Sequence, residues 1–311
     1  MHQNKHKKSD RHQPVLLEEV LQYLDPKKGE SYLDLTAGYG GHAEKVLDRT
    51  EQLESTVLVD RDSEAITYLQ DKFMESPLRL LHTDFLSAAT QLKDENTQFD
   101  CILADLGVSS PHLDKASRGF SVLTDEPLDM RMDQRQERTA ELVVNTYGEA
   151  ELAKVIRDYG EEPKAKKIAK RIVEKRPLST TKQLADIAAS VWGRSKRHPA
   201  TRTFQAIRIE VNDELRMLEQ ALPVWLSLLK PGGRIAVISF HSLEDRIVKH
   251  ELSKRSGNRY DAELKLLTKK PVTARQQELV FNPRARSAKL RVAVKINTKT
   301  NLEDQLKGVF K

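Results

Sequence analysis

The chain has 311 residues, of which 38% are hydrophobic and 32% are charged, and its formal net charge at pH 7 is +6. This length suits one large domain or two smaller ones, and no apolar run reaches the roughly 18 residues of a membrane-spanning helix, so we expect no membrane span. The single cysteine, Cys101, excludes an internal disulfide and favours a reducing, cytoplasmic setting.

Two segments of the chain carry the basic charge. Residues 160–216 have a net charge of +7 and residues 251–311 have one of +9, which leaves −10 for the rest of the chain. Two basic segments on an otherwise acidic protein favour the binding of a polyanion. The alternative is that lysine-rich helices and tails are only solvated.

In chain order, the first strong pattern is an apolar strand over residues 32–35 that ends at a glycine-rich turn containing Gly40 and Gly41. A helical pattern follows, and then a second strand over residues 56–59 that is closed by Asp60. This order is the first half of a nucleotide-binding α/β unit, in which an acid about 20 residues beyond the glycines holds the ribose hydroxyls. The pattern therefore predicts a cofactor of the adenosine type.

Further strands are predicted at residues 78–81 and 99–104, with a helical pattern between residues 60 and 73. This alternation indicates a parallel sheet that is covered by helices on both faces. Residues 234–239 predict another strand, entered through a Pro-Gly-Gly turn, and the alternating residues 289–296 predict a half-exposed edge strand.

The alternation breaks between the strands at residues 99–104 and 234–239. Residues 110–138 are rich in Pro, Gly, Asp and Arg and have little periodicity, whereas residues 140–192 have the pattern of three or four helices. A helix over about residues 212–229 then leads back to the sheet. A connection this long is not an ordinary loop, so we expect an inserted helical subdomain.

Acids or polar turns follow four successive predicted strands. Asp34 belongs to the first strand and Asp60 closes the second, while Asp84 and Phe85 follow the third and Asp105 follows the fourth. Ligands of an open α/β sheet bind beyond the carboxyl ends of its strands, so we expect these side chains to meet around one site. Phe85 is expected either to lie against an adenine or to pack in the core.

The glycine turn is compatible with two kinds of cofactor. It approaches the nicotinamide pattern G-x-G-x-x-G, with Ala43 in the place of the last glycine. Asp34, just ahead of the glycines, would repel a pyrophosphate but could pair with the amino group of a zwitterionic ligand such as S-adenosylmethionine. The acid therefore favours the methyl donor, and Asp60 can hold a ribose in either case.

Nine short motifs then occur in one order along nearly the whole chain. They are His-Gln-Pro-Val-Leu-Leu (12–17), Gly-Gly-His (40–42), Asp-Leu-Gly-Val-Ser-Ser-Pro (105–111), Arg-Gly-Phe-Ser (118–121), Pro-Leu-Asp-Met-Arg-Met-Asp (127–133), Tyr-Gly-Glu (147–149), His-Pro-Ala-Thr-Arg-Thr-Phe-Gln-Ala (198–206), Ser-Phe-His-Ser-Leu-Glu-Asp-Arg (239–246) and Asn-Pro-Arg-Ala-Arg-Ser (282–287). With these motifs the chain resembles the MraW/RsmH family, which methylates cytosine N4 in the decoding centre of bacterial 16S rRNA.

The resemblance implies a Rossmann-like α/β fold, that of class I S-adenosylmethionine-dependent methyltransferases, with a mostly parallel seven-stranded sheet and an inserted all-α subdomain. It implies a discontinuous methyltransferase domain over residues 1–112 and 212–311, with a substrate-recognition insert over residues 113–211. No metal is implied, and the implied contacts of S-adenosylmethionine are Gly40, Gly41, His42, Asp60, Phe85, Asp105 and His112. The relatives have glutamine where this chain has His112, whose neutral imidazole donates only one hydrogen bond.

Asp105 is the candidate catalytic residue, either as a contact of the cofactor's methionine end or as an acceptor for the target amine. Related amino-methyltransferases follow this acid with two prolines and an aromatic, which residues 105–108 lack. Positioning can supply about 7–11 kcal/mol and one charge-assisted hydrogen bond about 1.5–3, so we expect no indispensable general base. The candidates for stacking on the target base are Phe120, Phe204, Phe240 and His241.

The expected partner is 16S rRNA within the small ribosomal subunit, with the target cytosine turned out of its stack. The chain is expected to be a monomer or a homodimer. Arg131 is expected either to be clamped between Asp129 and Asp133 or to remain available, and His12 either reaches the catalytic face or caps the first helix. The candidates for contact with the RNA backbone are Lys164, Lys166, Lys167, Lys170, Arg171, Arg194, Lys196, Arg197 and Arg202.

Two other classes of function remain open from the sequence. The chain could be a small-subunit assembly factor that binds RNA and retains a cofactor pocket without turnover, which assays of methyl transfer would distinguish. It could also be a nicotinamide oxidoreductase, which a comparison of NAD and S-adenosylmethionine binding would distinguish.

Overall fold

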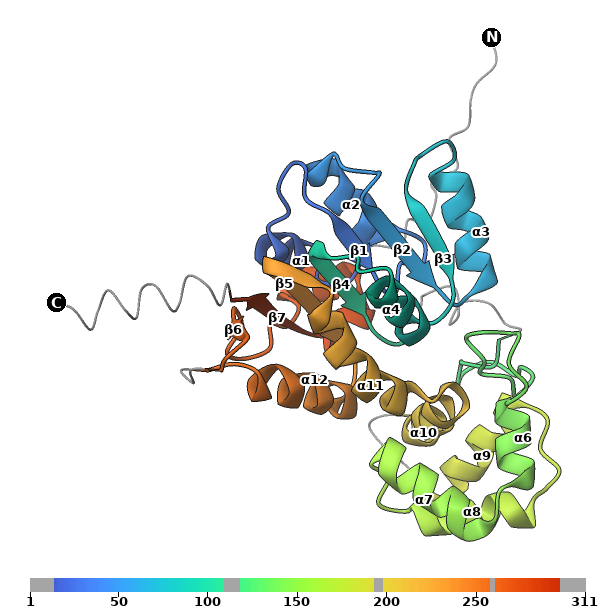
Figure 1. The fold of residues 1–311 in the computed structure, drawn as a ribbon. Helices are drawn as coiled ribbons and strands as arrows, with labels where there is room; N and C mark the ends of the chain where they lie inside the picture. Colours follow the sequence, from blue (N-terminus) through green and yellow to red (C-terminus); the bar gives the residue numbers. More distant parts are fainter. Residues whose placement is uncertain (1–13, 109–117, 193–197, 258–260, 297–311) are drawn as a thin grey trace.

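The structure is a computed structural model that describes residues 14–108, 118–192, 198–257 and 261–296 (Figure 1). These residues form a seven-stranded sheet in the order β3-β2-β1-β4-β5-β7-β6. The strands are β1 (Tyr32–Asp34), β2 (Thr56–Asp60), β3 (Arg79–His82), β4 (Phe99–Asp105), β5 (Leu229–Ser239), β6 (Leu264–Leu266) and β7 (Lys289–Lys295).

Strands β1 to β5 run parallel, and β7 runs antiparallel between β5 and β6. This strand order and direction is that of the Rossmann-like class I methyltransferase fold, so the predicted fold class is confirmed. The prediction that residues 289–296 form an edge strand is wrong, because β6 pairs with the outer side of β7. Alternating side chains report the faces of a strand and not its neighbours. The predicted Pro-Gly-Gly turn lies inside β5, where the pairing with β4 shifts register.

Helices cover both faces of the sheet (Figure 1). Alternate strand residues point to opposite faces, so Leu33 and Ile102 belong to one apolar core while Tyr32 and Cys101 belong to the other. The first core is closed by α4 (Phe85–Asp94), α11 (Glu214–Ser227) and α12 (Ser242–Lys254), and the second by α1 (Leu17–Leu24), α2 (Gly41–Thr50) and α3 (Ser63–Lys72).

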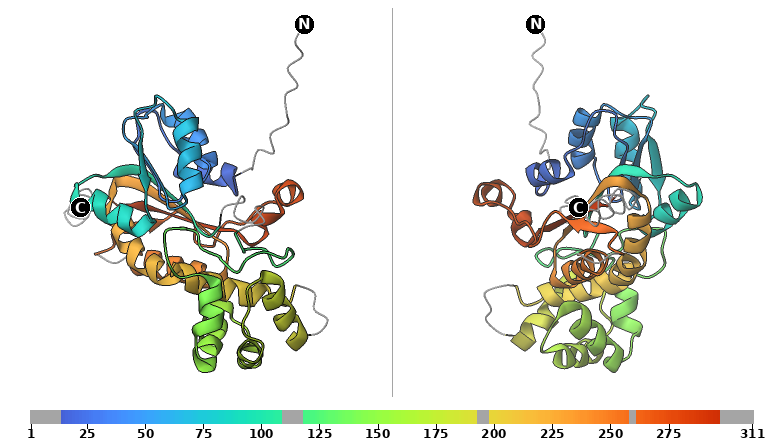
Figure 2. Two further views of the ribbon diagram at one scale, coloured as in Figure 1. Left: turned by 90° about the vertical axis from the view of Figure 1, so that its right-hand side faces the viewer. Right: turned by 60° about the vertical axis from the view of Figure 1, so that its left-hand side comes forward.

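Between β4 and α11 the chain forms a group of helices at one end of the molecule (Figure 2). Their apolar faces share a core of their own, which extends from Phe120 to Val211. The sequence predicted three or four helices within residues 140–192, and the structure has four there, followed by a fifth helix that the sequence pattern did not predict. The five are α6 (Ala140–Thr146), α7 (Glu149–Gly160), α8 (Ala165–Glu174), α9 (Thr181–Trp192) and α10 (Thr201–Asn212).

Side-chain caps determine where several helices begin. Asp62 at α3, Asp84 at α4 and Thr139 at α6 each accept a hydrogen bond from a backbone amide in the first turn of the helix. Such a cap stabilises a helix by about 1 kcal/mol. The two acidic caps follow β2 and β3, so they fix the path by which the chain leaves the sheet.

Buried polar side chains join the insert to the sheet. The side chain of Asn212, at the end of α10, donates to Met130 O at 2.8 Å and accepts from Met132 N at 2.8 Å. The guanidinium of Arg118 is 2% exposed and lies 3.5 Å from the carboxylate of Asp62. These contacts fix the loop that precedes α6 against both α10 and the start of α3.

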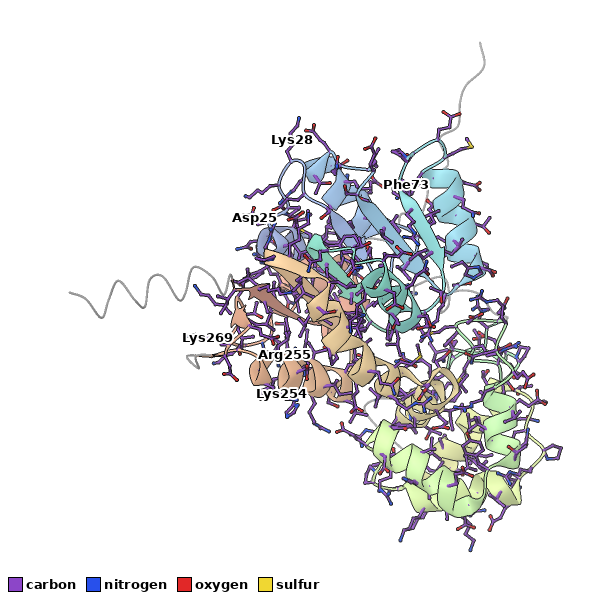
Figure 3. All side chains as sticks on the ribbon, viewed as in Figure 1. Asp25, Lys28, Phe73, Lys254, Arg255 and Lys269 are labelled. Atoms are coloured by element: carbon purple, nitrogen blue, oxygen red, sulfur yellow. The ribbon has the colours of Figure 1, made fainter. Side chains whose placement is uncertain are left out.

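The chain after α12 returns to the sheet through short elements. Arg255 follows the end of α12 and pairs with Glu251 at 2.6 Å and Glu263 at 2.9 Å, which ties this helix to the segment before β6 (Figure 3). A short helix, α13 (Gln276–Phe281), and a 3₁₀ turn, η1 (Pro283–Ser287), then lead into β7. In the described part of the chain, no helix combines the length and the apolar character needed to cross a membrane.

Candidate active site

The carboxyl ends of the parallel strands open onto one cavity of about 1090 Å³. Single small-molecule sites occupy about 300–1,000 Å³, so this cavity has room for a cofactor together with part of a second ligand. Its walls come from the turns after β1 to β5, from α10 and α11, and from η1. The lining residues that matter most here are Gly41, His42, Asp60, Phe85, Asp105 and Phe240.

Asp60, at the end of β2, holds the glycine turn that follows β1. Its carboxylate accepts from Gly38 N at 2.7 Å and from Asp62 N at 2.8 Å, one bond to each oxygen. It lines the cavity in the position that a ribose-binding acid requires.

The glycines Gly40 and Gly41 are required by close packing. A Cβ atom at Gly41 would lie 2.7 Å from a carbon of Pro14, and one at Gly40 would lie 2.9 Å from a carbon of Leu69. Gly40 also has a φ of +71°, a conformation that favours glycine. Gly41 lines the described cavity, whereas Gly40 stands behind it against α3.

Asp34 also lies behind the cavity wall. It is 1% exposed, and its carboxyl accepts from Tyr32 Oη at 2.8 Å and from Thr36 N at 3.2 Å. Burial raises its pKa to about 7, although the hydrogen bond from Tyr32 acts in the opposite direction. This position does not support the interpretation that Asp34 contacts a ligand's amino group directly, because neighbouring groups enclose the carboxyl.

Asp105, at the end of β4, contains an acceptor that has no donor. Its carboxyl is 24% exposed, Oδ2 lies 3.7 Å from Nδ1 of His42, and Oδ1 is buried without a hydrogen-bond partner among the described residues. Burial, followed by the charges of Asp34 and Glu244, raises the pKa of Asp105 well above its usual value. A buried polar atom of this kind is expected to meet a donor or a cation from a ligand.

His42, in the first turn of α2, lies beside the carboxyl of Asp105. Its Nε2 lies 2.9 Å from the carbonyl oxygen of Val15, which can only accept, so Nε2 carries a hydrogen. The remaining nitrogen, Nδ1, faces Asp105 Oδ2. That contact is attractive only when the imidazole or the carboxyl holds a further proton.

Phe85, at the start of α4, is part of both the core and the cavity wall. Its ring packs edge-on against Trp225 with 5.3 Å between centroids, and the residue is 9% exposed. Asp84 before it is engaged as the cap of α4 and accepts from the amides of Leu86 and Ser87 at 2.9 Å each. A contact between Phe85 and an adenine therefore stays a prediction, which its place in the wall permits.

A second group of buried charged side chains, which no sequence motif predicted, also lines the cavity. Arg208 of α10 forms two hydrogen bonds of 2.9 Å with Glu214 of α11, and both line the cavity. Glu244 of α12 accepts from the amide of Phe240 at 2.8 Å. Burial would raise the pKa of Glu244, but contact with His241 and the charge of Arg208 lower it overall. No local motif signals this pairing, because the partners meet only through helix packing.

One group of side chains has the spacing of a metal site. Potential ligand atoms of Glu214, His241 and Glu244 lie within 4.8 Å of one another. However, Nδ1 of His241 accepts from Glu244 N at 3.4 Å as the cap of α12, so the neutral ring carries its hydrogen on Nε2. A protonated nitrogen is not a metal ligand, and Arg208 already neutralises Glu214. We therefore assign no metal to this group.

The four aromatic candidates for base stacking occupy different places. Phe120 and Phe204 are buried in the core of the insert, and the ring of His241 is engaged as a helix cap. Of the four, only Phe240 is among the described residues that line the cavity.

Two other expectations concern the insert. Arg131 is bound by Asp129 through two hydrogen bonds of 2.8 Å, while Asp133 pairs with Arg135 instead, so the clamp forms with one acid and not with both.

Lys164 lies 4.2 Å from the centroid of the Trp192 ring. The predictions for His12, His112, Arg194, Lys196 and Arg197 fall outside the described residues.

Comparison with known proteins decides the family, since residues 9–296 match the MraW methylase family. The chain belongs to this family. It is 48% identical over 290 residues to the ribosomal RNA small subunit methyltransferase H of Nostoc sp., covering 91% of this chain and 92% of that one. It is 47% identical over 306 residues to the protein of the same name from Caldicellulosiruptor saccharolyticus, covering 92% and 99%. Among solved structures, an rRNA methylase from Streptococcus thermophilus gives a distant likeness, with a TM-score of 0.41 and 9% identity over 90% of this chain and 94% of its own.

As an MraW methylase with the class I fold, the chain is a methyltransferase, and its cofactor is S-adenosylmethionine, as the sequence predicted. The residues present fit this cofactor. The acceptor of Asp105 that lacks a donor, together with the buried acids Asp34 and Glu244, makes the cavity suitable for the positive charges of a sulfonium and an amino group.

Proposed function

We propose that this MraW methylase transfers the methyl group of S-adenosylmethionine to N4 of a cytosine in the decoding centre of 16S rRNA, within the small ribosomal subunit in the cytoplasm. The names of the relatives support the small-subunit rRNA, and the motif resemblance supports the cytosine amine. The observation that carries the proposal is the buried acceptor of Asp105 without a donor, in a cavity with room for two ligands.

When bound, S-adenosylmethionine supplies a methyl group that its positive sulfur makes electrophilic. The cytosine amine is a weak nucleophile because its lone pair is conjugated with the ring, and it gains positive charge as the new bond forms. Asp105, with Asp34 behind it and Glu244 nearby, surrounds this point with carboxyl groups, and a positive charge there favours their ionised forms. An acceptor aimed at a developing positive charge stabilises the transition state more than the ground state.

The surplus proton of the methylated amine needs a destination. Asp105 Oδ1 is the available acceptor, and the contact of Oδ2 with His42 lets the pair hold a proton until solvent removes it. One charge-assisted hydrogen bond stabilises by about 1.5–3 kcal/mol, whereas alignment of two reactants supplies about 7–11. We therefore assign to Asp105 a helpful role and to the cavity as a whole the larger role of positioning.

We propose specific duties for the residues around the cofactor. Asp60 accepts from the ribose hydroxyls, Phe85 lies against the adenine, and His42 and Asp105 adjoin the methionine end. Gly40 supports the turn from behind through its contact with α3. The proposed set of cofactor-binding residues is Gly40, Gly41, His42, Asp60, Phe85, Asp105 and His112.

We propose that residues 113–211 act as the substrate-recognition domain, inserted into a methyltransferase domain made of residues 1–112 and 212–311. The lysines Lys166, Lys167 and Lys170 are exposed on α8, where they can face a phosphate backbone. The protein acts in this proposal as a monomer or a homodimer.

The test uses small subunits from cells that lack this protein, incubated with purified enzyme and labelled S-adenosylmethionine. We expect one methyl group on one cytidine of 16S rRNA, which mass mapping locates and an N4-methylcytidine standard identifies. Binding of the cofactor and of subunits without methyl transfer would instead support a non-catalytic assembly factor. Binding of NAD in preference to S-adenosylmethionine would overturn the proposal entirely.

A further inference from the structure

The segment formed by α13 and η1 (residues 275–287) holds two large apolar side chains in solvent. Val280 is 67% exposed and Phe281 is 81% exposed, and α13 has no buried residue. A single exposed apolar side chain is common and needs no explanation. Here, however, an aliphatic and an aromatic side chain adjoin on one short helix.

The helix is fixed to the body of the protein by its other side. The carboxylate of Glu278 accepts from Leu16 N at 2.8 Å, and Arg275 pairs with Glu19 of α1 at 3.1 Å. Leu279 packs against the core that lies beneath α1. With this side anchored, Val280 and Phe281 form the outward side of the helix and are presented in a defined place.

That place adjoins residues that line the active-site cavity. Arg284 and Ser287 of η1 line the cavity, and Phe281 precedes Arg284 by three residues, a chain distance of no more than about 11 Å. Arg286 is exposed on the same turn. An exposed aromatic ring, a guanidinium and the entrance to the cavity therefore lie together on a segment of the chain with an excess of basic charge.

We propose that the α13–η1 segment binds a single-stranded stretch of RNA next to the target nucleotide, with Phe281 stacking on a base and Arg286 contacting a phosphate. This inference rests on the proposed function. A base turned out into the cavity leaves its neighbour without a stacking partner, and aromatic side chains stack on any base face. A second copy of this chain fits the surface less well, because a self-complementary contact would bring the arginines of two copies together.

The test compares substitutions at Phe281 for their affinity toward small subunits at one salt concentration. We expect Phe281→Ala to weaken binding about 5- to 100-fold, the range of one stacked base. Phe281→Leu keeps apolar area without a π face and should weaken binding similarly, whereas Phe281→Tyr should bind like the wild type. Leu267→Ala is the control, because Leu267 is an exposed apolar residue next to β6 and no residue within ten positions of it in the chain lines the cavity. The thermal shift caused by S-adenosylmethionine should be unchanged in every variant.

Three outcomes would overturn the inference. If Phe281→Ala binds subunits as tightly as the wild type, or if Phe281→Leu retains full affinity, stacking at this position is absent while the proposed function stands. If light scattering shows a dimer that Phe281→Ala converts to a monomer, the occupant of the surface is a second copy and not RNA. If the wild type itself does not bind small subunits, the proposed function fails first, and this inference fails with it.

Discussion

The carboxyl ends of the parallel strands and the helical insert differ in where their charged side chains lie. At the carboxyl ends of the strands, Asp34 is buried and Asp105 is half-buried, and desolvation raises the pKa of both. In the insert, the charges of Lys166, Lys167 and Lys170 lie in solvent on α8. Charged side chains therefore have different functions in the two regions: carboxyls that are shielded from solvent at the strand ends, and solvated lysines on α8.

The difference follows from the dielectric environment of each region. Charges that are shielded from water interact strongly with one another over a few ångströms. The carboxyl ends of the strands are therefore suited to binding one cation in one orientation. Exposed charges are screened beyond about 8–10 Å and keep their hydration, so the insert suits attraction to a polyanion without a fixed geometry. Four experiments test this contrast, beginning with the junction between the two regions.

The largest expected effect is on stability, at Asn212. Substitution to Ala removes its bonds to Met130 O and Met132 N and leaves two buried backbone groups without partners. We expect the free energy of unfolding to fall by about 2–4 kcal/mol, measured by urea denaturation. Asn145→Ala is the matched control, because Asn145 makes its two bonds to Leu178 inside the insert. A change at Asn212 below about 0.5 kcal/mol would show that the junction does not couple the regions.

The next effect is on catalysis, at Asp105. Asp105→Asn keeps the shape and removes the charge, so we expect the methyl-transfer rate to fall about 10- to 150-fold, together with weaker cofactor binding. Asp100→Asn is the control at the other end of β4, where Asp100 pairs with Lys230 at 2.7 Å; its rate should match the wild type. Complete loss of activity with normal cofactor affinity would make Asp105 an indispensable base and contradict our assignment.

The third effect is a pH dependence of cofactor affinity. The pKa of Asp34 is raised to about 7, so the carboxyl is neutral below that pH and ionised above it. A cation bound nearby favours the ionised form, so binding releases a proton and the Kd should fall up to about fivefold from pH 6 to 7 and up to about tenfold from pH 6 to 8, where it levels off. S-adenosylhomocysteine, whose sulfur is neutral, should depend less on pH in the same calorimetric series. Asp34→Asn should flatten the profile, and a steep profile in that variant would assign the proton to another group.

The smallest expected effect is the salt dependence of RNA binding. Substitution of Lys166, Lys167 and Lys170 by Gln should reduce the slope of log affinity against log salt by about 2–3, because each phosphate contact contributes roughly 0.7–0.9. The charge-matched control replaces Lys27, Lys28 and Lys93, which are exposed on the methyltransferase domain outside the described cavity lining (Lys28 in Figure 3). If both triple variants keep the wild-type slope, this face of α8 does not contact RNA.

Much of the fold was predictable because its signals are local. Apolar periodicity located six of the seven described strands and the four helices from α6 to α9. The strands β1 and β6 both have three residues, but only β1 is followed by a glycine turn that marks it in the sequence. The position of β7 inside the sheet depends on its pairing with β6, which the sequence pattern did not locate. Strand pairing is a non-local property, so the alternation of one strand cannot reveal it.

The sequence predicted which acids lie at the strand ends, but not which of them are exposed to the cavity. The acids Asp34, Asp60 and Asp105 all occupy strand ends, yet Asp34 is enclosed while Asp60 and Asp105 line the cavity. Whether a carboxyl reaches the cavity depends on the side chains that cover it. Asp34 is covered by Tyr32, whose hydroxyl donates to it. The pair Arg208–Glu214 was missed because its place in the wall arises from the packing of α10 and α11 beside the sheet edge.

The sequence alone was sufficient to predict the alternation of strands and helices, the glycine turn, the acids at the strand ends and the family. Each of these features depends on residues that are close together along the chain. Only the tertiary structure decided which carboxyl groups are sealed off, which one retains an acceptor without a donor, and that an exposed phenylalanine lies near the rim of the cavity. Burial and proximity between distant segments set the charge of a side chain and its access to a ligand, and neither exists until the chain is packed.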